Sequence, residues 1–343
     1  MKYIVLLTLL LTSSVFASDL DEIFDNALKG DLVATFRMPE VFKNKLQKAK
    51  LGEASSQNKV GIMFSLGLGV SKDSQAAIHW FSKAADQEDL VQKLKANIFL
   101  AHIYKTGDGV PEDDAGAIGW YMVGANNGFA TAQVGLGNIY NSQNNVEEAF
   151  IWYRKAADKG YELAEYIVGL SYAAGLGVPE NDAEAVKWFK KAADQGNGKA
   201  QSHLGDMHHK GAGVPENYAE AVRWYRKAAD QGIAGAQYNL GSMYDKGDGA
   251  PENGAEAVKW FRKAADQGMA AAQFNLGNMY ANGKGVPENN TRAYAWWSMA
   301  KTQGHTSAAN NIDILKPMMT TQQIADGQAL ATKCYESNYK DCD

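Results

Sequence analysis

Cysteine is almost absent from this sequence, and the two that occur, Cys334 and Cys342, lie within the last ten residues. A metal site would need two further ligands, and a redox-active pair more typically has Cys-x-x-Cys spacing. The two cysteines are close enough in sequence to close a small loop in an oxidising compartment. We therefore predict a disulfide that ties the C-terminal tail.

The sequence also lacks an excess of positive charge. Its 34 lysines and arginines are outnumbered by 39 aspartates and glutamates, so the formal net charge is −5. Proteins that neutralise nucleic-acid phosphates need surplus lysine and arginine. Nucleic acid is therefore not an expected partner.

No apolar run is long enough to span a membrane comfortably, which takes about 20 residues. The longest run belongs to Met1–Ala17, where Lys2 precedes apolar Ile4–Leu11 and small residues stand at the cleavage spacing. This arrangement is typical of a secretory signal peptide, and no cysteine follows that could carry a lipid anchor. We expect cleavage after Ala17, no stable membrane anchor, and a periplasmic or secreted protein.

The dominant feature that is present is a 36-residue unit, Ile233–Gly268, of which nearly everything from Glu53 to Gly304 is a variant copy. Both halves of the unit have the spacing of amphipathic helices, in the first half through Ala236, Leu240, Met243 and Tyr244 and in the second through Ala257, Trp260, Phe261 and Ala264. One such helical hairpin cannot bury both apolar stripes alone, so neighbouring copies must stack.

The hinge between the two helices is encoded locally. Gly247 and Gly249 supply the positive φ that ends the first helix, and Pro251 stands where no further helical turn is wanted. Asn253 is placed to cap the second helix, and Glu256 is placed to reach back to the N–H of the cap as a capping box.

Tryptophan marks the period along the chain. The steps between successive members are 40, 32, 36, 36, 36 and 36 residues, and the members are Trp80, Trp120, Trp152, Trp188, Trp224, Trp260 and Trp296. We interpret the long step, with four extra residues around Glu88–Lys95, and the short step, where Asn141–Asn145 replace the glycine hinge, as changes in loop length. Each tryptophan lies on an apolar stripe, so packing is favoured over carbohydrate stacking.

The organisation that follows is a signal peptide over 1–17, an N-terminal helical cap over 18–52, seven repeats over 53–304 and a C-terminal helical cap over 305–343. The C-terminal cap is expected to hold two helices, His305–Lys316 and Thr320–Tyr335, on either side of Pro317. The caps would cover apolar ends of the array.

The recurring pattern Ala-x-x-x-Leu-Gly-x-Met-Tyr-x-x-Gly-x-Gly-Val-Pro-Glu-Asn, followed by Glu-Ala-x-x-Trp-Phe-x-Lys-Ala-Ala-Asp-x-Gly, resembles the Sel-one-like repeat family, relatives of tetratricopeptide repeats. The resemblance covers seven tandem units. It implies an all-α fold, a right-handed α-solenoid of stacked helical hairpins, that acts as a protein-binding scaffold without a cofactor. Exported bacterial members suggest envelope maintenance or host interaction, by analogy only.

A hydrolase acting on β-lactams or cell-wall peptides is the alternative. Ser56-Gln-Asn-Lys59 matches Ser-x-x-Lys and Lys105-Thr-Gly matches Lys-Thr-Gly. However, Ser56 stands where sister repeats have alanine, Lys105-Thr-Gly aligns with hinge residues, and a Ser-Asp-Asn element is missing. No cysteine pair recurs in the repeats, unlike in some exported relatives, so we expect no catalytic residues.

A metal site is the alternative for the densest histidine cluster, which combines His203, His208 and His209 with Asp206. His203 and His208 are five residues apart, whereas two ligands on one helical face need a separation of three or four. His208 also replaces a core tyrosine. Packing is therefore favoured over metal binding.

Two lanes on the first helices vary between copies, which makes them candidates to bind a protein or peptide on the concave face. One lane holds Ile98, Val134, Tyr166, Ser202, Tyr238 and Phe274; the other holds His102, Asn138, Leu170, Asp206, Ser242 and Asn278. The candidate binding residues are Tyr166, Tyr238, Phe274, His102, Asn138, Asp206, Ser242 and Asn278. The alternative, that these side chains are ordinary surface and inter-helix packing, stays open.

Overall fold

The computed structural model describes residues 38–339 and Cys342, so the predicted signal peptide and the start of the N-terminal cap lie outside the described residues. Every regular element in this part of the chain is helical. The chain divides into two compact units, which we describe separately: Met1–Ala164 with Leu176–Val178, and Glu165–Gly175 with Pro179–Asp343.

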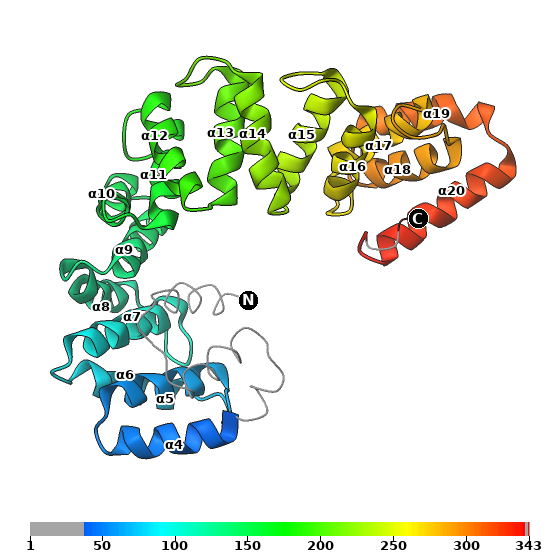
Figure 1. Ribbon diagram of the computed structural model, residues 1–343. Coiled ribbons are helices and arrows are strands. Elements are labelled where there is room, and N and C mark those ends of the chain that lie inside the picture. The colour runs from blue at the N-terminus through cyan, green and yellow to red at the C-terminus, as the bar shows by residue number, and fades with distance from the viewer. Residues whose placement is uncertain (1–37, 340–341, 343) are drawn as a thin grey trace. The chain divides into compact units, whose positions relative to one another are not determined.

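In the first unit α4 (Met38–Lys50) precedes three helical hairpins, drawn from blue to green in Figure 1. Their first helices are α5 (Ala54–Leu66), α7 (Leu90–Thr106) and α9 (Ala130–Ser142), and their second helices are α6 (Ser74–Ala85), α8 (Asp114–Asn126) and α10 (Val146–Ala157). Each hairpin packs on the next, and α4 packs on α5.

The second unit continues the same alternation. Its first helices are most of α11 (Glu162–Ala174), α13 (Gly198–Lys210), α15 (Ala234–Lys246) and α17 (Ala270–Asn282), and its second helices are α12 (Asp182–Asp194), α14 (Tyr218–Asp230), α16 (Gly254–Ala265) and α18 (Asn290–Thr302). It ends with α19 (Thr306–Leu315), the short η1 (Lys316–Met318) and α20 (Thr321–Glu336). Both α19 and α20 pack on α18. Each unit is thus a stack of helical hairpins, and the predicted all-α solenoid class is confirmed.

The hinge works largely as predicted. Gly247 ends α15 at φ 78°, in the left-handed region where a side chain is disfavoured, and Gly249 follows at φ 72°. Asn253 accepts a hydrogen bond from the backbone N–H of Glu256 and so caps α16.

The predicted capping box at this hinge is wrong. The backbone N–H of Asn253 donates instead to the carbonyl of Tyr244, at 2.8 Å, so it is not available to Glu256. The Glu256 carboxylate accepts from Trp260 Nε1 at 3.1 Å. The same cap-to-first-helix bond forms in every repeat, with donors and acceptors Asp73 and Phe64, Asp113 and Tyr104, Asn145 and Tyr140, Asn181 and Tyr172, Asn217 and His208, and Asn289 and Tyr280.

The four-residue insertion after the first repeat is also not a loop. It lengthens α7 to 17 residues, where the neighbouring first helices have 13. Four residues are close to one helical turn of 3.6 residues, and Asp89 caps the longer helix through Gln92 N–H. The added turn therefore leaves the buried face of α7 in register. In the shortened repeat the positive φ of the missing glycines is supplied by Asn144, at φ 60°.

The core is built where a glycine of the first helix lies against an aromatic ring of the second helix in six of the seven repeats, while α7 has Ala101 at this position. A Cβ added to Gly241 would lie 2.8 Å from Phe261, and one added to Gly205 would lie 2.5 Å from Tyr225. The same contact joins Gly61 to Phe81, Gly137 to Tyr153, Gly169 to Phe189 and Gly277 to Trp297. Both rings and the tryptophans beside them are buried, with Trp260 at 1% exposure, while Trp120 is half-buried.

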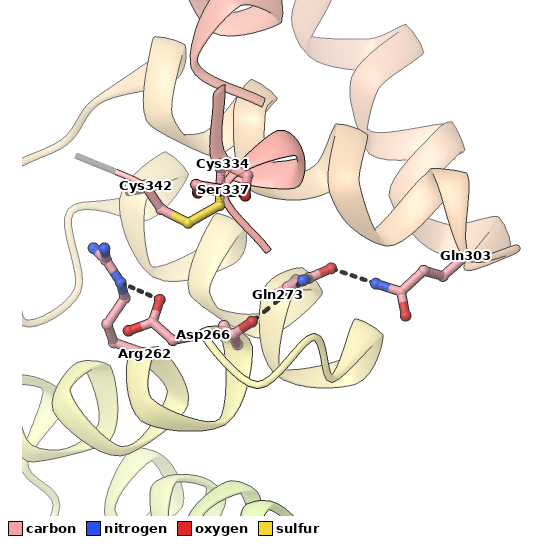
Figure 2. The surroundings of a disulfide bond; sticks show 8 residues. Arg262, Asp266, Gln273, Gln303, Cys334, Ser337 and Cys342 are labelled. Carbon is pink, nitrogen blue, oxygen red and sulfur yellow. Dashed lines mark hydrogen bonds and ion pairs between the residues drawn. A yellow bond between two sulfur atoms is a disulfide. The ribbon is translucent and has the colours of Figure 1, made fainter. Parts of the chain in front are cut away.

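A row of buried glutamines joins successive repeats. Gln273 donates from Nε2 to the carbonyl of Ala265, at 3.3 Å, and its Oε1 accepts from Gln303, at 2.9 Å (Figure 2). Gln201 and Gln237 are bonded in the same way. Each glutamine thereby satisfies a helix-end carbonyl that would otherwise be buried without a partner.

At the C-terminal end, a disulfide joins Cys334 to Cys342 across a Cα–Cα distance of 4.4 Å (Figure 2). Both cysteines are buried in the core cluster that contains the last repeat, with Tyr339 packed against that cluster. The tail is therefore folded back onto its own unit.

Two glycines of α15 give a matched test of this packing. We expect Gly241→Ala to destabilise the chain by about 1–3 kcal/mol, because the new methyl group meets the Phe261 ring. Gly235→Ala should stabilise it by about 0.5–1 kcal/mol, since nothing lies within 4 Å of the added Cβ and alanine is the better helix former. Urea unfolding of both variants measures the difference. Equal effects of the two substitutions would contradict the proposed role of the ring contact.

Candidate functional site

The Ser-x-x-Lys match lies on α5 with its serine inside the protein. Ser56 is 0% exposed, and its hydroxyl has no hydrogen-bond partner in the described part of the chain. A serine nucleophile must reach its substrate and be activated by an adjacent base. The burial of Ser56 is incompatible with that role, as expected for a position that sister repeats fill with alanine.

The lysines of the two matches lie in different settings. Burial and the charge of Lys95 lower the pKa of Lys59 to about 8. Lys105 instead makes ion pairs with Glu112 at 2.9 Å and Asp114 at 2.8 Å, and hydrogen bonds to these carboxylates raise its pKa. Lys105 is thus part of its own hinge, and the two motifs do not form an acyl-serine site.

The three clustered histidines have different neighbours. His203 stacks on Phe189, with ring centroids 5.0 Å apart, and burial lowers its pKa. His209 packs on Tyr218, and the carbonyl of His208 accepts the cap bond from Asn217. Over residues 38–339 and Cys342, no group of three histidine, cysteine, aspartate or glutamate side chains is placed to hold a metal ion.

The first lane is not uniformly at the surface. Ile98 and Val134 in the first unit are 1% and 7% exposed and belong to the core, whereas Tyr166, Tyr238 and Phe274 in the second unit are half-buried. These three rings pack on aromatic neighbours: Tyr166 on Phe189 and His203, Tyr238 on Phe261, and Phe274 on His305 at 4.4 Å. One side of each ring is therefore supported by the protein while part of it stays accessible.

The chemistry of each second-lane residue follows that of the aromatic residue that the second helix of the same repeat places against it. Asn138 accepts from the hydroxyl of Tyr153 at 2.8 Å, Asp206 from Tyr225 at 2.7 Å, and Asn278 from Trp297 Nε1 at 3.1 Å. Where the second helix has Phe189 or Phe261, which cannot donate, the lane holds Leu170 or Ser242. Variation along this lane is thus partly explained by packing within each repeat. A comparison of each lane residue with the aromatic residue of the second helix in the same repeat would have revealed this pairing from the sequence.

These bonds also affect titration. Burial raises the pKa of Tyr225, with the hydrogen bond to Asp206 adding to the effect, and burial raises the pKa of Tyr153 to about 12. His102, the lane residue of the second repeat, is half-buried, and burial lowers its pKa. Asp206 is the one carboxylate among the second-lane side chains.

The second unit also contains a cleft that the sequence did not indicate. It has a volume of about 500 Å³ and lies between α18, α19 and α20, with Tyr294, Met299, Ile312, Ala331 and Tyr335 among its lining residues. Its lining is mostly apolar, and Tyr335 is 62% exposed. No helix among the described residues is both long enough and apolar enough to cross a membrane.

A family model of the Sel1 repeat matches seven segments of the chain, at residues 54–89, 94–129, 130–161, 163–197, 198–233, 234–269 and 270–305. The chain is a Sel1 repeat protein. Proteins of this kind are generally protein–protein interaction scaffolds, and the fold is typically non-enzymatic.

Solved structures agree with the family. This Sel1 repeat chain is similar to a protective antigen present in uropathogenic Escherichia coli strains, with 26% identity, a TM-score of 0.66, and coverage of 98% of this chain and 85% of the other. It is also similar to a Sel1 repeat protein from Oxalobacter formigenes, with 29% identity, a TM-score of 0.67, and coverage of 90% and 93%.

A more distant likeness is to chitin synthase regulatory factor 3 of Schizosaccharomyces pombe, which is 29% identical over 133 residues. The match includes 38% of this chain and 11% of the yeast protein. The chain therefore spans about a tenth of the length of that relative.

Removing the hydroxyl of Ser56 tests the acyl-serine alternative and its structural explanation together. We expect Ser56→Ala to raise the free energy of unfolding by about 1 kcal/mol, because a buried hydroxyl without a partner is costly. Ser171→Ala, which removes a hydroxyl bonded to Ile167, should not stabilise the chain. A chromogenic β-lactam is not expected to be hydrolysed by either form; turnover that vanishes in Ser56→Ala would restore the hydrolase.

The low pKa of Lys59 predicts a pH dependence of stability. Its ordinary value is 10.5, so between about pH 8 and 10.5 the unfolded chain binds more protons at this residue than the folded chain. Stability due to Lys59 should therefore rise with pH through this window. Denaturant unfolding at several pH values should show a smaller rise for Lys59→Met than for the natural chain; identical pH profiles would contradict the assignment.

Proposed function

We propose that this chain is an exported scaffold that binds a protein or peptide partner through the first helices of its second unit. The proposal depends on one observation: Tyr238 and Phe274 are half-buried aromatics on α15 and α17, and polar Asn239, Ser242, Asn275 and Asn278 on the same two helices are also half-buried. We call the side chains that α13, α15, α17 and α19 leave at least partly exposed the first-helix face. We propose that the complex with this partner acts in envelope maintenance or host interaction.

The chemistry of this face favours protein recognition. Aromatic side chains supply large contact area with little loss of conformational freedom, and they are enriched among the residues that dominate interface energies. Tyr238 is already held against Phe261, and Phe274 against His305, so binding would cost little further ordering. The face is therefore prepared for a partner at the second unit, whereas the corresponding Ile98 and Val134 of the first unit are buried.

Export is supported by three independent features. The sequence at 1–17 has the pattern of a signal peptide, and the only two cysteines form a disulfide, which persists in oxidising compartments. One of the similar structures is a protective antigen present in uropathogenic strains. These features support a site of action in the periplasm or outside the cell.

Partner capture tests the binding face. Crosslinking to the periplasmic fraction of the native host should capture a partner with the natural chain, and the double variant Tyr238→Ala/Phe274→Ala should lose most of that capture. Helicity and the melting transition should change little, because both rings are half-buried. Trp260→Ala is the matched control: this indole is 1% exposed, so we expect a loss of about 3–5 kcal/mol of stability.

Two results would count against the proposal. Full capture by the Tyr238/Phe274 variant would show that the partner binds elsewhere, for instance in the cleft between α18 and α20. Absence of the chain from the periplasmic and external fractions would exclude the proposed site of action.

A further inference from the structure

Two first helices of the second unit, and α19 which follows the last repeat, present the same amide at the same position of the 36-residue period. Asn239 on α15, Asn275 on α17 and Asn311 on α19 are separated by 36 residues each, and all three are half-buried. The corresponding residue of α13 is His203. The structure therefore aligns three side-chain amides along successive repeats.

Two of these amides are oriented from within the protein. Asn239 donates from Nδ2 to Asp206 at 3.2 Å, and Asn311 donates to Asn278 at 3.1 Å. The acceptors are themselves held, Asp206 by Tyr225 and Asn278 by Trp297. An amide has two N–H donors and one acceptor oxygen, so a single bond leaves capacity for another molecule.

Space and chemistry beside the amides suit a close neighbour. One helical turn before Asn239 and Asn275 stand Gly235 and Ala271, and a Cβ at Gly235 would meet nothing within 4 Å. The remaining positions of this surface on α15 and α17 are Tyr238, Ser242, Phe274 and Asn278. None of these eight residues carries a charge, so this part of the surface offers amides, a hydroxyl, rings and small residues. The charged side chains beside it are Asp206, which accepts from Asn239, and Lys246, one turn beyond Ser242.

We propose that Asn239, Asn275 and Asn311 form a ladder that binds the main chain of an extended polypeptide segment. This proposal depends on the proposed function and names the partner's chemistry. An asparagine side chain can pair with both the N–H and the C=O of a peptide unit. Such pairing is open to an extended chain, whose peptide groups are unpaired, and closed to a helix, whose peptide groups are already bonded.

The spacing of the ladder fits an extended chain. Asn311 on α19 bonds Asn278 on α17, and Asn239 on α15 bonds Asp206 on α13, so these successive helices lie side by side. Packed helices lie about 8–10 Å apart. An extended chain in the polyproline II conformation has three residues per turn and advances about 3.1 Å per residue, so every third residue would meet an equivalent asparagine. Recognition through the main chain would depend little on sequence, and Tyr238 and Phe274 would add contacts with apolar side chains.

The test uses peptides selected on the full chain from a random display library. Peptides of about 12 residues are long enough, at about three residues a repeat, to reach from α13 to α19. The bound peptide is then resynthesised with single N-methyl groups, which remove one main-chain donor at a time. We expect about tenfold weaker binding at positions with a three-residue period and little loss between them. This measurement leaves the protein unchanged, so it does not depend on how a variant folds.

Protein variants give the complementary measurement. Asn239→Leu and Asn275→Leu should each weaken peptide binding about tenfold with an unchanged melting transition. Asn126→Leu is the matched control: it is an exposed asparagine on α8 of the first unit, and its variant should bind like the natural chain.

The outcomes separate this inference from the proposed function. If N-methylation and the Asn239 and Asn275 variants have no effect while Tyr238→Ala/Phe274→Ala abolishes binding, the ligand is a helix held by its side chains. The ladder is then wrong and the proposed function stands. If no peptide is selected, both proposals are wrong. They are also both wrong if none of the changes weakens binding: N-methylation, the Asn239 and Asn275 variants, and Tyr238→Ala/Phe274→Ala.

Discussion

The close approach of the two helices in each repeat is the constraint on which the rest of the structure depends. It exists because a glycine such as Gly241 leaves no side chain between the first helix and the ring of Phe261, and an added Cβ would lie 2.8 Å from that ring. Helix propensity opposes glycine by about 1 kcal/mol relative to alanine, so the gain from burying the ring has to exceed that cost. The ring in turn lies under the first-lane residue, here Tyr238, and so supports it from below.

Polar bonds follow from this packing. When the ring is a tyrosine or tryptophan, its donor is brought to the second lane and requires an acceptor there, which explains Asp206 opposite Tyr225 and Asn278 opposite Trp297. The buried glutamines meet the same demand at helix ends. Gln133 is an exception, because its repeat has Lys159 at the position where most other repeats have the donating glutamine. Lys159 donates to the carbonyl of Gly128 instead, and Gln133 Oε1 has no hydrogen-bond partner among the described residues.

Binding capacity is therefore what remains after packing has been satisfied. In the second unit, smaller residues on the first helices, such as Gly235 and Ala271, leave the neighbouring rings and amides partly open. In the first unit the same lane is filled by Ile98 and Val134, which the core covers. The two units are built from the same type of repeat but differ in the side chains that they expose to a partner. Asn239 and Asn311 are held in place by donating to Asp206 and Asn278, which lie on the preceding helical hairpins.

By itself the sequence determined the repeat, its two helices, the glycine hinge and the Asn253 cap, because these depend on residues close together in the chain. It did not predict the position of Glu256, which was expected to accept from the backbone N–H of Asn253, whereas that N–H donates to the carbonyl of Tyr244. It also did not show that four inserted residues would form a turn of α7. Tertiary structure alone decided which lane residues are accessible. Ile98 and Tyr238 occupy equivalent positions, but exposure is set by the side chains that neighbouring helices place around them, and those lie tens of residues away in the sequence.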